Sequence, residues 1–178
     1  MSDGDRSDPR AAVLATARVM NAERLNRGAA GNVSVRRGDG FLITPTGMAY
    51  DACVPDDVVF MGLDGRAEGR RKPSSEWRFH RDIYAARPEA GAIVHAHAPF
   101  AVSLACMGMA IPPFHYMVAR FGGTDVRCAD YALFGSQELS DAVVRALEGR
   151  CACLMAHHGM VVFGRHLDHA LALAVALE

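Results

Sequence analysis

The sequence predicts a mixed α/β (α+β) fold, in which helices flank both faces of a central, mostly antiparallel β-sheet. Two observations favour it: helical and strand-like segments alternate along the chain, and several neighbouring strands are joined by turns too short to hold a helix. With 178 residues, 51% of them hydrophobic, the chain can bury one sizeable core but is too short for two well-built domains. We therefore expect one domain over residues 1–178.

The first predicted element is a helix that starts at Asp8 and Pro9, which suit the N-cap and the first helical position. Sequence rich in Ala and Leu follows as far as Arg27. Gly28 then fits a C-terminal stop, because glycine adopts the left-handed conformation that ends many helices.

Strands dominate the next part of the chain. A β-hairpin is predicted where two β-prone segments flank Gly38, Asp39 and Gly40, which favour a tight turn. A further strand follows a second turn, and the polar, basic segment after it is expected to be an exposed loop. These elements are the strand 32–36, the turn 38–40, the strand 41–43, the turn 44–47, the strand 58–63 and the loop 68–73.

The second half of the chain alternates helices with apolar strands. Ser74, Ser75 and Glu76 open a predicted helix, with the serines as its caps. This helix is expected to end near Arg87, because Pro88 cannot continue it. The remaining predicted elements are the strand 92–96, the helix 99–107, chain breaks at 112–113 and 122–123, the helix 137–147 capped by Ser136, the strands 151–156 and 160–163, and the helix 167–177.

Charge and hydropathy exclude several classes of protein. Lys and Arg number 19 and Asp and Glu 20, a balance that lacks the basic excess of nucleic-acid or polybasic membrane surfaces. No apolar stretch reaches the ~18–20 residues that cross a bilayer, and the polar N-terminus lacks the apolar core of a secretion signal. We expect a soluble, cytoplasmic protein that binds neither nucleic acid nor membrane.

The cysteines are expected to be small buried thiols in a reducing compartment. Their number is odd, they lie among apolar neighbours, and no CxxC pair is present, which disfavours a zinc ribbon or a thioredoxin-like site. They are Cys53, Cys106, Cys128, Cys151 and Cys153.

Four potential metal ligands occur in the order Glu76, His95, His97 and His158. His95 and His97 are two residues apart at the end of an apolar predicted strand, so both point to the same side of it. Neutral imidazole suits Zn²⁺, Mn²⁺, Fe²⁺ or Co²⁺. A third histidine and a carboxylate complete a site in which the carboxylate can leave and act as a base. The alternative is that each histidine is a hydrogen-bonded core or surface residue.

The order of these residues, and the motifs that are missing, narrow the function classes. In a cupin the HxH pair comes before the glutamate, whereas here Glu76 precedes the pair at a predicted helix start. HExxH, GxSxG, GxxxxGK and GxGxxG are all absent, which removes support for a metalloprotease, a serine hydrolase, a P-loop protein or a Rossmann protein.

Three short segments combine small or hydroxyl residues with a turn or a helix start, where free backbone N–H groups bind phosphate. Each pair also fits the ordinary composition of turns and caps, and that explanation stays open. The best candidate is the pair of serines before Glu76, which places an anion site and a carboxylate within one helical turn. The three pairs are Gly31–Asn32, Thr46–Gly47 and Ser74–Ser75.

Seven motifs in this order resemble the class II aldolase/adducin family, and within it most closely the L-fuculose-1-phosphate aldolases. The resemblance extends from about Leu14 to the C-terminus. It rests on GNVSVR (31–36), LITPTGM (42–48), PSSEWRFH (73–80), IVHAHAP (93–99), HYM (115–117), FGSQELS (134–140) and HHGM (157–160).

The resemblance implies a three-layer fold and a homotetramer with fourfold (C4) symmetry, whose active sites lie between neighbouring subunits. His95, His97 and His158 would hold a divalent metal, most often zinc. Glu76 would be a metal ligand in the resting site and the catalytic acid/base once substrate binds, and Tyr116 of the adjacent subunit would donate a proton on the aldehyde side. The phosphate pocket would consist of Gly31, Asn32, Thr46, Gly47, Ser74 and Ser75.

The implied reaction is the reversible cleavage of a ketose 1-phosphate to dihydroxyacetone phosphate and a short aldehyde. The sugar would be fuculose-like, or a 5-deoxy- or methylthio-pentulose phosphate. Two alternatives stay open: another enzyme of this scaffold (a pentulose-phosphate 4-epimerase, a methylthioribulose-1-phosphate dehydratase or a decarboxylase) and a non-catalytic module like the adducin head. Glu76 favours an aldolase, because the epimerases of this fold carry Asp there and the adducin head lacks the ligands.

Some positions depart from the family or have two interpretations. The family continues a few dozen residues beyond the position of Glu178, with a tyrosine in that tail that helps to shape the aldehyde side, and Ala29 stands where a threonine is common. His80, four residues after Glu76 on one helical face, is either a partner of the site or a packing residue. His157 is not expected to bind metal together with its neighbour, because adjacent residues of a strand face opposite sides.

Overall fold

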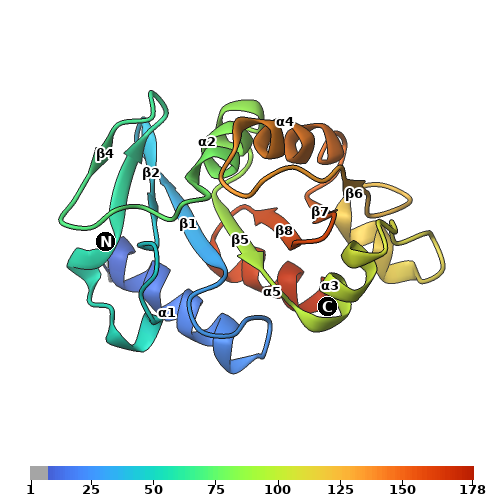
Figure 1. The fold of residues 1–178 in the computed structure, drawn as a ribbon, viewed down its shortest axis with the longest axis horizontal. Helices are drawn as coiled ribbons and strands as arrows, with labels where there is room; N and C mark the ends of the chain where they lie inside the picture. Colours follow the sequence, from blue (N-terminus) through green and yellow to red (C-terminus); the bar gives the residue numbers. More distant parts are fainter. Residues whose placement is uncertain (1–7) are drawn as a thin grey trace, which may run out of the picture.

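The computed structural model describes residues 8–178, and within them eight strands form a single sheet (Figure 1). The strand order is β4-β3-β2-β1-β5-β8-β7-β6, and every neighbouring pair is antiparallel except β6 and β7. The mostly antiparallel sheet predicted from the sequence is thereby confirmed. The strands are β1 (Asn32–Arg37), β2 (Gly40–Ile43), β3 (Val59–Gly62), β4 (Ala67–Glu68), β5 (Ala92–Ala96), β6 (Cys128–Ala129), β7 (Ala152–Met155) and β8 (Gly159–Gly164).

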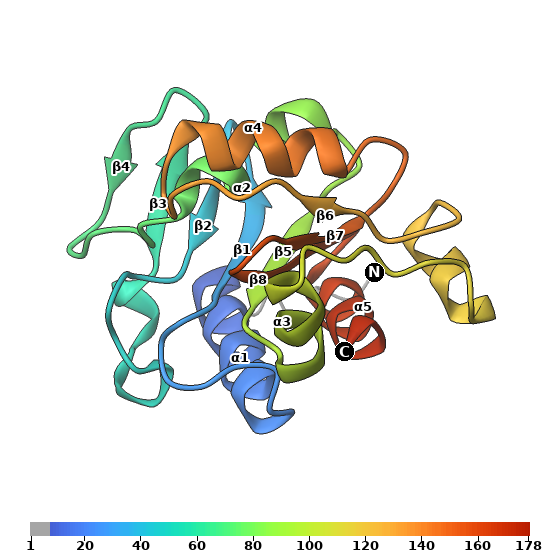
Figure 2. The same cartoon turned by 45° about the vertical axis from the view of Figure 1, so that its right-hand side comes forward.

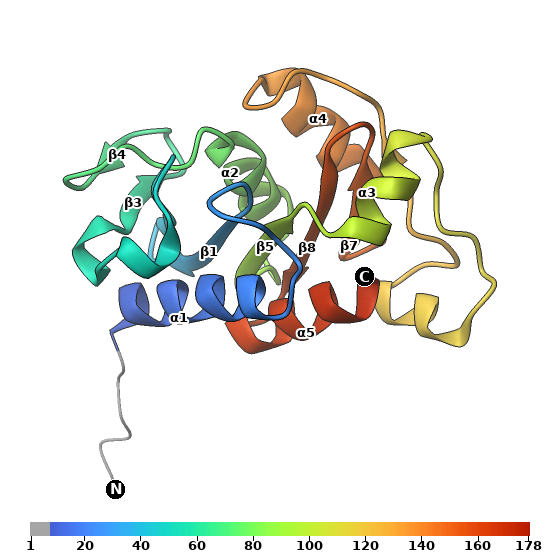
Figure 3. The same ribbon diagram turned by 60° about the horizontal axis from the view of Figure 1, so that its bottom comes forward.

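Helices cover both faces of this sheet, as predicted. Helices α2 and α4 pack against each other on one face, and α1 and α5 lie side by side on the other, together with α3 (Figures 2 and 3). The α-helices are α1 (Pro9–Ala22), α2 (Trp77–Ala86), α3 (Pro99–Cys106), α4 (Gln137–Ala146) and α5 (Leu167–Leu177), and the 3₁₀-helices are η1 (Tyr50–Ala52), η2 (Pro55–Asp57) and η3 (Tyr116–Phe121).

The central strand β5 divides two apolar clusters by the alternation of its side chains. Ala92 and Val94 belong to the cluster under α1 and α5, whereas Ile93 belongs to the cluster under α2 and α4. His95 continues the second face, and its ring lies edge-on to Phe79 of α2 with centroids 5.4 Å apart. The buried strand therefore delivers a histidine to the side of the sheet on which α2 begins.

Helix α1 begins as predicted but ends earlier. The side chain of Asp8 accepts a hydrogen bond from the backbone N–H of Arg10, so it is the N-cap. The helix ends at Ala22 instead of Arg27, because Arg24 adopts a left-handed conformation with φ 61°. The N–H of Leu25 then bonds to the carbonyl of Met20, which gives a Schellman-type end without glycine.

Other differences concern short elements and the start of α2. Strands β4 and β6 and the 3₁₀-helices span two to six residues, too few for a periodic pattern, and β4 lies at the edge of the expected loop. The serines do not cap α2: Glu76 occupies its N-cap position without a side-chain capping bond. Ser74 Oγ instead accepts the N–H of Glu76, just before the helix. Helix α4 does carry its predicted cap, since Ser136 Oγ accepts the N–H of Leu139.

The expectation that all the cysteines are buried is wrong for three of them. Cys53 and Cys153 are buried, but Cys128 and Cys151 are partly exposed and Cys106, at the end of α3, is exposed. Apolar neighbours in the sequence do not ensure that a cysteine is buried when its helix or strand ends at the surface. Among the described residues, no helix is both long enough and apolar enough to cross a membrane.

Candidate metal centre

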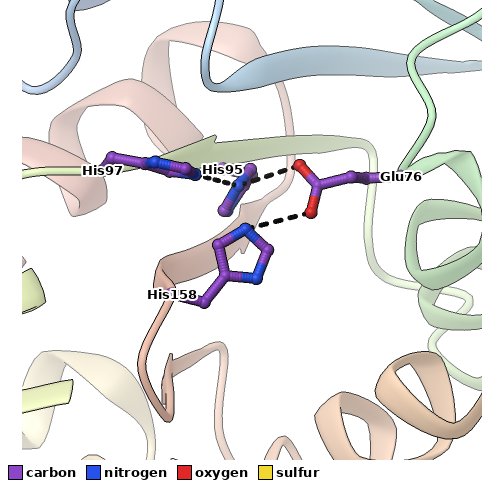
Figure 4. Close-up of side chains that lie close together, drawn as sticks. All are labelled: Glu76, His95, His97 and His158. Carbon is purple, nitrogen blue, oxygen red and sulfur yellow. Dashed lines mark hydrogen bonds and ion pairs between the residues drawn. The ribbon is translucent and has the colours of Figure 1, made fainter. Parts of the chain in front are cut away.

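Three separate parts of the fold bring the four predicted ligands together. Glu76 lies at the N-cap of α2, His95 in β5 and His97 just after it, and His158 in the turn between β7 and β8. Each contributes one ligand atom to a group in which all four atoms lie within 4.8 Å of one another (Figure 4). The side chains in the figure all point toward one centre.

The spacing of these atoms fits a tetrahedral cation. His95 Nε2 lies 3.1 Å from Glu76 Oε2 and 3.1 Å from His97 Nε2. His158 Nε2 lies 3.1 Å from Glu76 Oε1. Four donors at bond lengths of about 2.0–2.1 Å around a tetrahedral zinc ion would stand about 3.3 Å apart, and these three separations are close to that value.

The hydrogen bonds of His95 show that the group suits a cation. His95 Nδ1 lies 2.8 Å from the backbone oxygen of Met160, which can only accept, so Nδ1 carries the proton. In the neutral ring the Nε2 lone pair therefore points toward the Glu76 carboxylate, which is itself an acceptor. Glu76 Oε1 is also buried, and no contact satisfies it with hydrogen-bond geometry, although His158 Nε2 lies 3.1 Å away. A cation at the centre would satisfy these facing lone pairs.

The charge states of Glu76 and His97 suit a metal, which requires deprotonated ligands. Burial alone raises the pKa of Glu76, but the charge of His95 and hydrogen bonds from His158 and His95 outweigh it, so the pKa is lowered and the carboxylate is ionised. Burial and the neighbouring histidines lower the pKa of His97 to about 4, which leaves a neutral ring. Complete burial opposes protonation of His95, yet Glu76 raises its pKa, as expected where a positive charge is favoured.

The predicted anion-binding pairs converge near this group. Asn32 lies opposite His95 in the sheet and donates through Nδ2 to Ser74 Oγ and to Glu76 Oε2, both at 3.0 Å. The backbone N–H groups of Thr46 and Ser74 bond to the carbonyls of Lys72 and Thr44, which joins the 46–47 turn to the serines. Ser75 and both turn residues are exposed, so ligand can reach them.

Gly31 is required by the close approach of two backbones. A Cβ atom at this position would lie 2.4 Å from the carbonyl oxygen of His95, which cannot give way without moving β5. Tyr50 also donates its hydroxyl proton to the carbonyl of Gly31. The first predicted pair is therefore fixed beside the strand that carries the metal ligands.

A cavity of about 350 Å³ opens beside the metal ligands. The sequence did not predict that the loop before Ser136 forms the far wall of this cavity, although Phe134 belongs to the FGSQELS motif. Tyr131, Leu133 and Phe134 are large apolar residues that stay exposed in this loop, and such a run before the Ser136 cap is the signal that was available. The lining residues are Ala30, Ser75, Glu76, His97, Tyr131, Ala132, Phe134, His157 and His158.

Two further residues lie outside the group of ligands. Tyr116, in η3, is 81% exposed and does not line the cavity, so a single chain does not bring it to the ligands. His157 is exposed in the β7–β8 turn with φ 56°, and its ring faces Tyr131 instead of the other histidines. His157 was not expected to bind metal because adjacent residues of a strand face opposite sides. That reason is wrong, because His157 and His158 both lie in the turn and not in a strand.

A family model described as the class II aldolase and adducin N-terminal domain matches residues 11–178. The chain belongs to the class II aldolase and adducin family. The family resemblance and the three-layer fold expected from the motifs are thereby confirmed. A solved L-fuculose 1-phosphate aldolase superimposes with a TM-score of 0.93 at 35% identity, covering 97% of this chain and 82% of that one.

Curated relatives within this family are named aldolases. The 5-methylthioribulose-1-phosphate/5-deoxyribulose-1-phosphate aldolase of Rhodospirillum rubrum is 54% identical over 98% of this chain and 79% of its own length. The L-fuculose phosphate aldolase of Escherichia coli is 45% identical over 93% of this chain and 77% of its own length. The expected enzyme class is confirmed: the protein is a class II aldolase, and its glutamate–histidine group is able to bind a divalent metal.

Proposed function

We propose that this class II aldolase reversibly cleaves a ketose 1-phosphate to dihydroxyacetone phosphate and a short aldehyde. A 5-deoxy- or methylthio-pentulose 1-phosphate is the preferred sugar, and a fuculose-like sugar is the second choice. The ranking follows the relatives, because the one named for methylthioribulose and deoxyribulose phosphates is 54% identical and the one named for fuculose phosphate is 45% identical. The convergence of four ligand atoms beside a cavity is the observation that carries the proposal.

Glu76, His95, His97 and His158 hold one divalent cation, which we propose to be zinc because the donor set has four members and is rich in imidazole. When bound, this cation supplies positive charge where negative charge develops as a C–C bond beside a carbonyl breaks. The protein contributes a rigid frame for it, since Met160 fixes the orientation of His95 from the neighbouring strand.

We assign proton transfer at the carbon of the breaking bond to Glu76. At rest the imidazoles keep its pKa low. When substrate oxygens take its place, Glu76 leaves these imidazoles but stays in a buried position, and burial raises a carboxyl pKa toward the working pH. The same residue is thus a weak base while it faces the imidazoles and an effective acid/base only beside bound substrate.

The remaining assignments concern substrate orientation and assembly. The backbone and hydroxyl groups of Gly31, Asn32, Thr46, Gly47, Ser74 and Ser75 bind the phosphate. Tyr116 of the adjacent subunit donates a proton on the aldehyde side. Its exposure in a single chain supports this arrangement, which requires a neighbouring subunit, and we propose a homotetramer with C4 symmetry and sites between subunits. We further propose that the enzyme acts in the cytoplasm.

Elemental analysis of the purified protein, followed by a retro-aldol screen, tests this function. We expect about one zinc per chain, and release of dihydroxyacetone phosphate from 5-deoxyribulose 1-phosphate or its methylthio analogue faster than from fuculose 1-phosphate. Protein stripped of metal is the matched control. A product with the carbon skeleton of the substrate intact would instead indicate an epimerase or dehydratase of this scaffold, and loss of carbon dioxide a decarboxylase.

A further inference from the structure

A buried network of hydrogen-bonded polar side chains lies behind the candidate metal ligands. Tyr84 Oη lies 2.8 Å from Ser34 Oγ, which lies 2.7 Å from His80 Nδ1, and the Nε2 of the same ring lies 2.5 Å from Asn32 Oδ1. Asn32 then contacts Ser74 and Glu76 through Nδ2. The first four residues are no more than 1% exposed, so protein groups must satisfy their polar atoms.

The contact between Asn32 and Glu76 determines the direction of every hydrogen bond in this network. Asn32 Nδ2 lies 3.0 Å from a Glu76 carboxylate oxygen and 3.0 Å from Ser74 Oγ, both of which can accept, so the amide nitrogen faces this side. Asn32 Oδ1 therefore faces His80, and His80 Nε2 must carry a proton to donate to it. His80 Nδ1 is then an acceptor and takes the proton of the Ser34 hydroxyl, whose oxygen accepts from Tyr84.

The same hydrogen-bond directions leave the hydroxyl proton of Ser74, at the end of the network nearest the proposed phosphate site, without an acceptor. Ser74 Oγ accepts from Asn32 Nδ2 at 3.0 Å and from the backbone N–H of Glu76 at 3.3 Å. Both bonds use oxygen lone pairs, so the Ser74 hydroxyl proton remains available to donate to an anion. A reversed Asn32 amide would place an oxygen against both Ser74 and the Glu76 carboxylate, which would repel the carboxylate and engage the hydroxyl proton.

We propose that His80 is a positioning residue: its Nε2–H holds the Asn32 amide in the orientation that steadies Glu76 and leaves the Ser74 hydroxyl free for phosphate. Packing alone does not require a histidine. The ring stacks on Phe79 at 4.7 Å and on Phe41 at 6.4 Å between centroids, contacts that phenylalanine would also make. The zinc and turnover readouts rest on the proposed function, whereas the tautomer and the binding of inorganic phosphate are measured independently of it.

His80→Phe tests the proposal because it keeps an aromatic ring between Phe79 and Phe41 and removes both the donor and the acceptor. We expect a folded variant that binds a full complement of zinc, since no ligand is lost. Its affinity for inorganic phosphate, measured by calorimetry, should fall about tenfold or more, because Asn32 Oδ1 is left without a donor in a buried site. The kcat of the zinc-loaded variant should fall by a similar factor.

Two further variants separate positioning from stability. In His80→Gln the side-chain amide can donate to Asn32, so phosphate affinity and kcat should return to within about threefold of the wild type. Tyr84→Phe removes a buried hydrogen bond at the far end but leaves His80 Nε2–H in place. It should lower the unfolding midpoint without changing phosphate affinity or kcat.

The outcomes are distinct. Long-range proton–nitrogen NMR correlations of the wild type, assigned by comparison with His80→Phe, should show a neutral His80 with the proton on Nε2. A proton on Nδ1, or wild-type phosphate affinity and kcat in His80→Phe, would overturn the proposal, as would equal losses in Tyr84→Phe. If the wild type cleaves no ketose phosphate while the tautomer and the phosphate effect are found, the proposed function fails and the positioning role stands.

Discussion

Glu76 shows how one residue obtains two chemical states from its surroundings. It is buried, which favours the neutral acid, but it faces two imidazole nitrogens and the amide of Asn32, which favour the ion. The contacts with His95 and His158 are those that a substrate would replace, whereas burial and Asn32 stay. The proposed exchange of roles between metal ligand and acid/base would need Glu76 to leave the two imidazoles while staying buried beside Asn32.

Replacing Glu76 by Gln should separate metal binding from turnover. The variant keeps an oxygen near the ion and three histidines, so we expect it to retain most of its metal. Turnover should fall on the order of 10²-fold or more, since the group that moves the proton is lost. Zinc content and kcat measured on one preparation check this, with the surface variant Glu148→Gln as the control. A near-normal rate would remove Glu76 from the chemistry.

His95→Ala should abolish metal binding and cleavage together. His95 is fully buried at the middle of the ligand group, within 3.1 Å of both Glu76 and His97. Metal content by mass spectrometry should fall well below one ion per chain. His166→Asn is the matched control, because His166 only caps α5 and asparagine preserves that acceptor. Full activity in a metal-free His95→Ala preparation would defeat the assignment.

At the scale of residues, the sequence predicted which side chains meet but not how they are oriented. The HxH spacing was sufficient for His95 and His97, because alternation along a strand is a local property. Glu76 and His158 required the family motifs, since nothing local reports that a helix start and a distant turn meet. The Met160 carbonyl that sets the His95 tautomer comes from the neighbouring strand, so only the assembled sheet reveals it.

At the scale of elements, one buried carboxylate joins the η2 turn to the segment before α2. Asp57 accepts the N–H of Val54 and hydrogen bonds from Arg70 and Arg71. The two arginines of the basic segment therefore bind Asp57, and they do not line the cavity beside the candidate metal ligands. They brace the stretch of chain that leads into Ser74.

Asp57 should make stability depend on pH in an acidic window. Hydrogen bonds from Arg71 and from the Val54 N–H lower its pKa to about 2, against about 3.9 in an unfolded chain. The folded state thus binds this proton less readily, so its contribution to the free energy of unfolding is complete above the unfolded pKa and disappears as the pH falls toward about 2.

The variant Asp57→Asn should lose this contribution. We expect a lower unfolding free energy than the wild type at neutral pH, and a difference that shrinks as the pH falls from about 4 to about 2. Urea denaturation at a series of pH values measures both. Asp51→Asn, with a side chain 97% exposed, is the control and should follow the wild type. A constant difference across this window would contradict the role of Asp57.

Element prediction succeeded where the signal was local and failed where it was not. Pro9 with its Asp8 cap, the Gly38–Gly40 hairpin turn and the Ser136 cap all fixed boundaries that the structure confirms. The end of α1 was wrong because an arginine adopts the conformation usually left to glycine. Strand β6 has two residues, and its partner β7 lies more than twenty residues later, so no window of sequence contains the pair.

At the scale of the whole molecule, the proposed tetramer explains why a residue implied in catalysis lies away from the ligands. Tyr116 and Phe114 are both exposed on the segment around η3, remote from the cavity lining. Light scattering should give four times the 19.1 kDa of one chain. The sequence of one chain does not indicate which of its surfaces contact another subunit. The tetramer was therefore predicted from the family resemblance alone.

Mixed tetramers should reveal sites built from two subunits. Glu76→Gln and Tyr116→Phe chains, each poorly active alone, should regain activity when co-expressed in equal amounts. In a ring where each site takes Glu76 from one subunit and Tyr116 from the next, about a quarter of the sites would hold both intact residues. The specific activity of the mixture checks this. Activity no higher than the mean of the two parents would place both residues in the same chain's site.

The ligand group gathers the start of α2, the middle strand β5 and the β7–β8 turn, segments far apart along the chain. An ion held there would link these three segments. Because it would bind only the folded state, it would raise the free energy of unfolding as the concentration of free ion increases. If the proposed ion is bound, the melting temperature of this enzyme should rise with the concentration of free ion. A melting temperature measured after treatment with a chelator would describe the metal-free protein, not the metal-bound enzyme.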